Sequence, residues 1–154
     1  MRNLEIIRRR MHGTRLWGVP AKTPVEVLRA LGAVQAQEFA VAKWSIAQRT
    51  ENATDAVLAK LFDRGTILRT HVLRPTWHFV LPADIRWMLE LTAARVKARM
   101  APYDPRLELT EKIYDKSNAV IARAVKDGHR TRKELGDALE RQASTRGASA
   151  SRIS

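Results

Sequence analysis

The sequence predicts a mostly α-helical fold with one small β-hairpin, organised as a winged helix-turn-helix followed by the incomplete start of a second winged helix. Strong helix-start signals recur along the chain, as at Thr23-Pro24-Val25-Glu26, which offers a hydroxyl cap, a proline at the first helical position and a glutamate placed for a capping box. The helical pattern gives way to a strand-like one over residues 66–73 and 76–80, which are rich in β-branched and aromatic residues. Three helices followed by a hairpin is the order of a winged helix, a fold that presents one helix to the major groove of DNA.

The helices before the hairpin are delimited by caps and by glycines that end them. Asn3 is expected to cap a first helix whose residues Leu4, Ile7 and Met11 share one apolar face. In the short third helix we expect Trp44 to face the core. The expected bounds of these helices are residues 3–13, 23–32, 39–47 and 52–65.

The second half of the chain contains the hairpin turn, a long helix and the start of another unit. Arg74-Pro75 is expected to form the turn, and a long helix is expected from Pro82 through Val96. After a loop at 101–106, two further helices start at Thr110 and Thr131, the first of them ending at Gly128. We expect three segments, namely an N-terminal winged helix at 1–100, the helical start of a second one at 101–143, and a disordered tail at 144–154.

The charge of the chain indicates a polyanionic partner. Its 154 residues include 28 Lys and Arg against 16 Asp and Glu, which gives a formal net charge of +12. Hydrophobic residues make up 45% of the chain, enough for a folded core, so this is not a disordered basic tail. Neutralisation by double-stranded DNA would release counterions and favour binding. The alternative is that the high charge reflects only a general preference for arginine in the source genome.

Several classes of protein and site are not expected. The absence of cysteine excludes disulfides and thiolate metal sites, and the four histidines are scattered without metal-ligand spacing. No apolar run is long enough to cross a bilayer, and the N-terminus lacks the apolar segment of a secretory signal. We therefore expect no metal site and no membrane association, and a cytoplasmic, nucleoid-associated location.

An ordered set of segments carries a resemblance to a known family. Taken together, they resemble the AlkZ-like family, the winged-helix DNA glycosylases with which bacteria repair crosslinked DNA, and the similarity covers roughly residues 1–140. The segments are Gly32–Glu38, Trp44, Asp63–Thr70, Arg74–Val80 and Ala83–Met88.

The resemblance implies an activity and a site. Family members hydrolyse the N-glycosidic bond of N7-alkylated or crosslinked guanine without a metal or cofactor, and their motif of two glutamines separated by one residue falls here on Gln35 and Gln37. The chemistry suits this pair, because a cationic N7-alkylguanine leaves readily and the enzyme needs mainly to orient a water against C1′. Residues two apart share a side in extended backbone but not on a helix. A catalytic pair therefore requires non-helical backbone at Gln35 and Gln37; otherwise they are two polar loop residues.

Two departures from the family leave other functions open. The resemblance implies proteins more than twice as long, with further winged helices that complete a DNA channel, so we expect this chain alone to be an incomplete enzyme. The family's Arg-Gly-Thr also appears here as Arg74-Pro75-Thr76, and proline fixes a backbone angle that glycine leaves free. The alternatives are a non-enzymatic DNA-binding module, such as a transcriptional regulator, and a truncated product without activity.

Basic and aromatic residues supply the candidate DNA contacts. Arg69 and Arg74 are expected to reach the DNA backbone, because they lie in and beside the hairpin, and the run Arg8-Arg9-Arg10 is either a phosphate contact or a solvated face. His78 is expected to be partly buried and bound to backbone rather than to DNA. Trp44, Trp77 and Trp87 are expected in packing roles, which leaves Trp17 as the candidate for an exposed aromatic.

Overall fold

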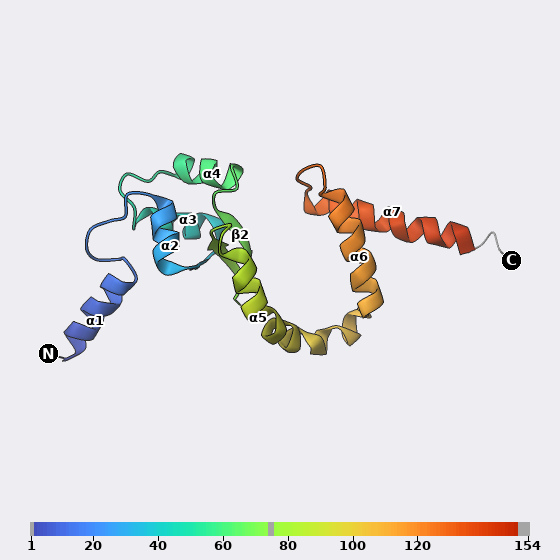
Figure 1. Ribbon diagram of the computed structural model, residues 1–154, viewed down its shortest axis with the longest axis horizontal. Helices are drawn as coiled ribbons and strands as arrows, with labels where there is room; N and C mark the ends of the chain where they lie inside the picture. Colours follow the sequence, from blue (N-terminus) through green and yellow to red (C-terminus); the bar gives the residue numbers. More distant parts are fainter. Residues whose placement is uncertain (1, 74–75, 151–154) are drawn as a thin grey trace. The chain divides into compact units, whose positions relative to one another are not determined.

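A computed structural model describes residues 2–73 and 76–150 of the chain. The chain divides into two compact units, residues 1–99 and 100–154, and each is described by itself below. The described residues contain seven α-helices, two short 3₁₀ helices and one three-stranded antiparallel sheet (Figure 1). This confirms the predicted mostly α-helical fold with a small β element.

The first unit follows the predicted order of helices and hairpin. Thr23 caps the second helix, since its hydroxyl accepts a hydrogen bond from the backbone N–H of Glu26 at 3.2 Å, and Gly32 ends it with a φ of 74° that suits glycine. Thr54 caps the fourth helix in the same way. The elements are α1 (Arg2–Gly13), α2 (Pro24–Leu31), β1 (Val34–Gln35), α3 (Phe39–Ala47), α4 (Asp55–Asp63), β2 (Leu68–His71), β3 (Trp77–Val80) and α5 (Ile85–Met100).

The sheet has one strand more than the predicted hairpin. Its order is β1-β3-β2, and both pairs are antiparallel. Strand β1 has only two residues, too few to produce an alternating pattern in the sequence. The predicted turn at Arg74-Pro75 lies outside the described residues. Strand β1 is therefore an edge strand of the sheet, formed by the segment between α2 and α3.

An aromatic cluster packs two helices onto this sheet. The rings of Phe39, Phe62 and Phe79 lie with their centroids 4.6 to 5.6 Å apart, and Phe79 is fully buried. A second, smaller cluster of Val80, Val72 and Met88 joins the sheet to α5. The core therefore lies between the sheet and the helices that precede and follow it.

One expectation about the core is wrong. The sequence predicts that Trp44 faces inward, but 64% of it is exposed. The buried residues of α3 are Ala42 and Ile46, which lie four apart on one face of the helix. Trp44 lies two positions from each of them and therefore points to the other side.

Arg49 links the residue that follows helix α1 to the end of α3. Arg49 donates hydrogen bonds from Nε to the carbonyl of Thr14 and from Nη1 to the carbonyl and hydroxyl of Ser45. Partial burial lowers the pKa of the Arg49 guanidinium from its usual value. The apolar residues of α1, which include Leu4 and Ile7, remain exposed.

The second unit consists of two short 3₁₀ helices and two α-helices. The predicted caps are present: the Thr110 hydroxyl accepts a hydrogen bond from the backbone N–H of Ile113, and Thr131 forms a reciprocal capping box with Glu134. The helix that begins after Thr110 ends at Ala124, before the predicted stop at Gly128. The elements are η1 (Ala101–Tyr103), η2 (Pro105–Leu107), α6 (Glu111–Ala124) and α7 (Arg132–Ala150).

The C-terminal segment differs from the expectation of a disordered tail. Helix α7 extends through Ala150, and residues 151–154 lie outside the described part of the chain. Alanine has the highest intrinsic helix propensity, so a stretch without apolar periodicity can still continue a helix. Within the described residues, none of the helices combines the length and apolar character needed to cross a membrane.

Candidate functional site

The two motif glutamines lie outside the helices and are both exposed. Gln35 ends strand β1, and the pairing with β3 continues one residue further through a 2.7 Å hydrogen bond from the Ala36 N–H to the Trp77 carbonyl. Ala36 between them is fully buried in the core. Gln35 in the strand and Gln37 in the bend that follows are thus both exposed, on either side of the buried Ala36. The backbone has the non-helical form that a catalytic pair requires.

His78 is the cross-strand partner of Gln35. Their Cα atoms pair in the register of β1 and β3, and directly opposite residues of antiparallel strands project to the same face. His78 is only 5% exposed, and its Nδ1 lies 2.9 Å from the carbonyl oxygen of Thr76. The expected buried, backbone-bound histidine is therefore observed, on the same sheet face as the motif glutamine.

Thr76 adds a polar group to the same stretch. Its hydroxyl is buried, and no hydrogen-bond partner reaches it among residues 2–73 and 76–150. Thr76 lies directly before β3, and its carbonyl oxygen is the group that Nδ1 of His78 contacts. Sequence reasoning did not single out this hydroxyl, because a threonine in a β-rich run has no distinguishing pattern.

Arg69 contacts the motif backbone directly. Its Nε and Nη2 donate hydrogen bonds, each 3.0 Å long, to the carbonyl oxygens of Ala36 and Gln37. Its guanidinium carbon lies 4.5 Å from the ring centroid of Trp77 and 5.7 Å from that of Phe39. The residue expected to reach DNA therefore has much of its guanidinium engaged within the protein. Arg74, the other expected contact of the hairpin, lies outside the described residues.

The side chain of Gln37 is also linked to strand β3. Its Oε1 accepts a long hydrogen bond, 3.5 Å, from the backbone N–H of Trp77. At that length the contact is weak and leaves the amide able to bind another donor. The indole of Trp77 packs edge-on against His71, with 4.1 Å between ring centroids. The expected packing role of Trp77 on the hairpin is thus observed.

One of the three N-terminal arginines lies beside an exposed aromatic ring. Arg8, Arg9 and Arg10 are all exposed, and the Arg8 guanidinium lies 5.8 Å from the ring centroid of Trp17, which is 54% exposed. Arg9 pairs with Glu5 at 2.8 Å one helical turn away, an exposed ion pair of little energetic weight. Basic side chains beside an accessible indole are a combination that nucleic-acid surfaces use.

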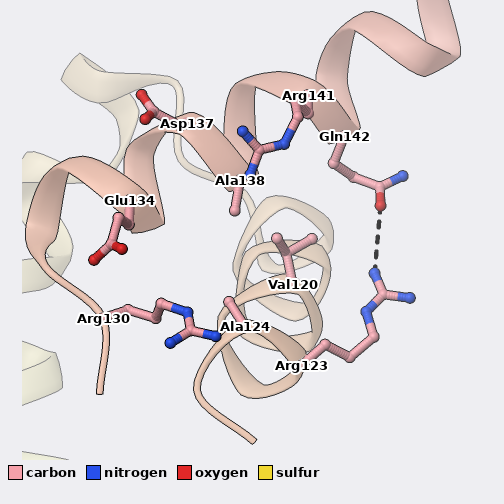
Figure 2. Close-up of a pocket in the computed structure, with 9 residues that line it drawn as sticks. All are labelled: Val120, Arg123, Ala124, Arg130, Glu134, Asp137, Ala138, Arg141 and Gln142. Carbon is pink, nitrogen blue, oxygen red and sulfur yellow. Dashed lines mark hydrogen bonds between the residues drawn. The ribbon is translucent and has the colours of Figure 1, made fainter. Parts of the chain in front are cut away.

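A shallow groove in the second unit is lined by arginines from both of its helices and the loop between them. Val120 and Ala138 lie at its centre, and Arg123 donates a hydrogen bond to the side-chain oxygen of Gln142 at 3.3 Å (Figure 2). Arg130 and Arg141 complete the basic lining, while Glu134 and Asp137 supply carboxylates at the rim. Sequence reasoning missed these arginines, because helical spacing alone did not reveal which of them converge.

No group of three or more His, Asp or Glu side chains within the described ranges is placed to hold a metal ion. The chemistry that the described residues offer is hydrogen bonding by amides and hydroxyls, together with the positive charge of arginines. Such groups can orient a water molecule and stabilise a developing charge.

Comparison with known proteins identifies the class. A model of the family described as DNA glycosylase AlkZ-like matches residues 28–153, which is most of the chain. The chain therefore belongs to the AlkZ-like DNA glycosylase family. No curated protein and no solved structure shows significant similarity to it. The predicted resemblance is confirmed, and the matched range contains the two glutamines.

Proposed function

We propose that this chain binds double-stranded DNA through its helix and hairpin unit, in the manner of a winged helix, and carries the water-positioning glutamines of a DNA glycosylase acting on N7-alkylated guanine. The observation that carries the proposal is the exposed pair Gln35 and Gln37 on non-helical backbone, flanking the buried Ala36. Membership of the glycosylase family supports the assignment of the pair to catalysis.

The proposed reaction needs little acid catalysis. Alkylation at N7 gives guanine a positive charge, so the bond between C1′ and N9 breaks with its electron pair passing to a neutral alkylguanine. The sugar acquires oxocarbenium character, and a water oxygen bonds to C1′ and then loses its proton to solvent. The amide oxygens of Gln35 and Gln37 would accept hydrogen bonds from this water and fix its direction of attack.

The charge of the chain supports the proposed DNA partner. A net charge of +12 favours a polyanion, and the exposed arginines Arg8, Arg9 and Arg10 can each meet a phosphate. Trp17 beside Arg8 offers a ring on which an unstacked base can pack. We infer that the protein acts on the chromosome, in the nucleoid.

Release of N7-methylguanine from duplex DNA tests this function. The wild-type chain is incubated with DNA containing N7-methylguanine, and abasic sites are counted against spontaneous depurination. Gln35→Ala and Gln37→Ala should each abolish enzymatic release while leaving DNA affinity unchanged. Gln48→Ala is the matched control, because Gln48 is an exposed glutamine of the same unit outside the motif.

Two outcomes would contradict parts of the proposal. DNA binding without any release by the wild-type chain would favour a non-enzymatic DNA-binding module. Absence of binding to duplex DNA at low salt would overturn the proposed partner itself, since electrostatic binding is strongest there.

A further inference from the structure

Arg69 is tied to the glutamine motif by a contact that sequence spacing does not reveal. It lies in β2, where its Cα pairs with that of Phe79, and it is separated from Ala36 and Gln37 by 33 and 32 residues. Its planar guanidinium spans two consecutive carbonyls with two separate N–H groups. A contact of this kind specifies the position of the backbone at the motif.

The two carbonyls lie where regular pairing ends. The ladder between β1 and β3 closes with the hydrogen bond from the Ala36 N–H to Trp77, and α3 begins at Phe39 after Glu38, whose side chain makes no capping hydrogen bond. The backbone of residues 36–37 therefore belongs to neither element. Polar backbone groups in such a segment need other partners, and Arg69 supplies them.

Aromatic rings hold the guanidinium in place. Trp77 and Phe39 lie within cation–π distance of it, at 4.5 and 5.7 Å. Trp77 also contacts the motif through its own backbone, because its carbonyl accepts from the Ala36 N–H and its N–H donates to Oε1 of Gln37. Arg69, Trp77, Ala36 and Gln37 thus form one closed set of contacts.

We propose that Arg69 is a positioning residue, which fixes the backbone of Ala36 and Gln37 so that the two glutamine side chains are presented together, rather than a contact to the DNA backbone. The catalytic meaning of this role rests on the proposed function of the glutamines. The positioning of the backbone by Arg69 does not depend on that function, because it concerns the conformation of the protein before any DNA binds.

Arg69→Lys separates positioning from charge. Lysine keeps the positive charge, but its single ammonium cannot reproduce the planar fork that reaches both carbonyls. We expect duplex affinity and its salt dependence to remain those of the wild type, while the single-turnover rate of base release at saturating protein falls roughly 10- to 100-fold. Arg86→Lys, a change at an exposed arginine in α5, is the matched control and should leave both unchanged.

A spectroscopic measurement tests positioning in the absence of activity. In the DNA-free protein, Arg69→Lys should shift the NMR signals of the Gln37 side-chain amide and speed hydrogen exchange at the Ala36 N–H, whereas Arg86→Lys should do neither. The Arg69 Nε–H signal of the wild type should be slow to exchange and should not move when duplex DNA is added.

Failure of the positioning role of Arg69 and failure of the proposed function would give different results. An Arg69→Lys variant with wild-type Gln37 and Ala36 signals would overturn the positioning role. So would an Arg69 Nε–H signal that moves on DNA addition together with a salt dependence reduced in Arg69→Ala, because these mark a phosphate contact. If the wild-type chain releases no base, the proposed function fails, while the NMR comparison still decides whether Arg69 positions the motif.

Discussion

Gln35 and His78 are direct cross-strand partners, yet the first is exposed and the second is almost fully buried. Their side chains project to the same face of the sheet. A buried polar ring beside an exposed amide gives that face two different kinds of residue, one that supports the fold and one that is available to a ligand. Substitution at the two positions should therefore have different consequences.

His78→Ala should destabilise the protein, whereas Gln35→Ala should not. Loss of the buried imidazole and of its hydrogen bond to the Thr76 carbonyl is expected to lower the free energy of unfolding by about 1–3 kcal/mol. Gln35→Ala at an exposed position should change it by no more than about 0.5 kcal/mol. Urea unfolding of both variants measures the difference. Equal destabilisation would mean that Gln35 serves the fold rather than a bound water.

The aromatic cluster under the motif should dominate the stability of the first unit. Phe79→Ala removes a fully buried ring that contacts Phe39 and Phe62, and is expected to cost about 3–5 kcal/mol. Trp44→Ala, at a mostly exposed position, should cost little despite the size of the side chain. Thermal unfolding followed by circular dichroism compares them. A large effect of Trp44→Ala would instead favour a tryptophan that faces the core, as the sequence pattern predicts.

Local signals in the sequence predict most of the fold. Thr23, Thr110 and Thr131 cap helices as expected, because a cap is a contact between residues three apart and can be recognised in the local sequence. The hairpin strands are also predicted, since β-rich runs show their own pattern. These elements need no knowledge of the rest of the chain.

Contacts between distant residues account for what the sequence does not predict. Strand β1 is defined by its pairing with β3, and a segment of two residues is too short to show a strand pattern in the sequence. Arg69 meets the motif across 32 residues, so its place in the hairpin suggests a DNA contact when only the sequence is considered. The non-helical backbone of Gln35 and Gln37 can be predicted from the chemistry of a catalytic pair, whereas the contact of Arg69 with that backbone depends on tertiary structure.

The N-terminal arginines should determine part of the salt dependence of DNA binding. Removing one arginine that binds a phosphate should reduce the slope of log affinity against log salt by about 0.9. Arg8→Gln and Arg10→Gln are expected to do so singly, and their double variant roughly twice as much. Fluorescence anisotropy with a labelled duplex at several salt concentrations measures the slopes, with Arg86→Gln as the control. Unchanged slopes would show that these arginines form a solvated face only.

The capping box of α7 should make the second unit sensitive to acid. Hydrogen bonds from the backbone N–H and hydroxyl of Thr131 to the Glu134 carboxylate hold the pKa of Glu134 below its usual value of 4.5. A lowered folded-state pKa means that the carboxylate stabilises the helix start fully above pH 4.5, and that this contribution is lost as the pH falls through the folded-state pKa.

An NMR titration of the Glu134 carboxyl carbon tests this directly. Its midpoint should lie below 4.5 in the wild type and move toward 4.5 in Thr131→Ala, which removes the hydroxyl donor. Glu134→Gln should weaken the acid-induced loss of amide protection at the start of α7, whereas Glu140→Gln, at an exposed carboxylate of the same helix, should not. A wild-type midpoint at or above 4.5 would mean that the capping box does not persist in solution, and the beginning of α7 would then depend on packing against α6 alone.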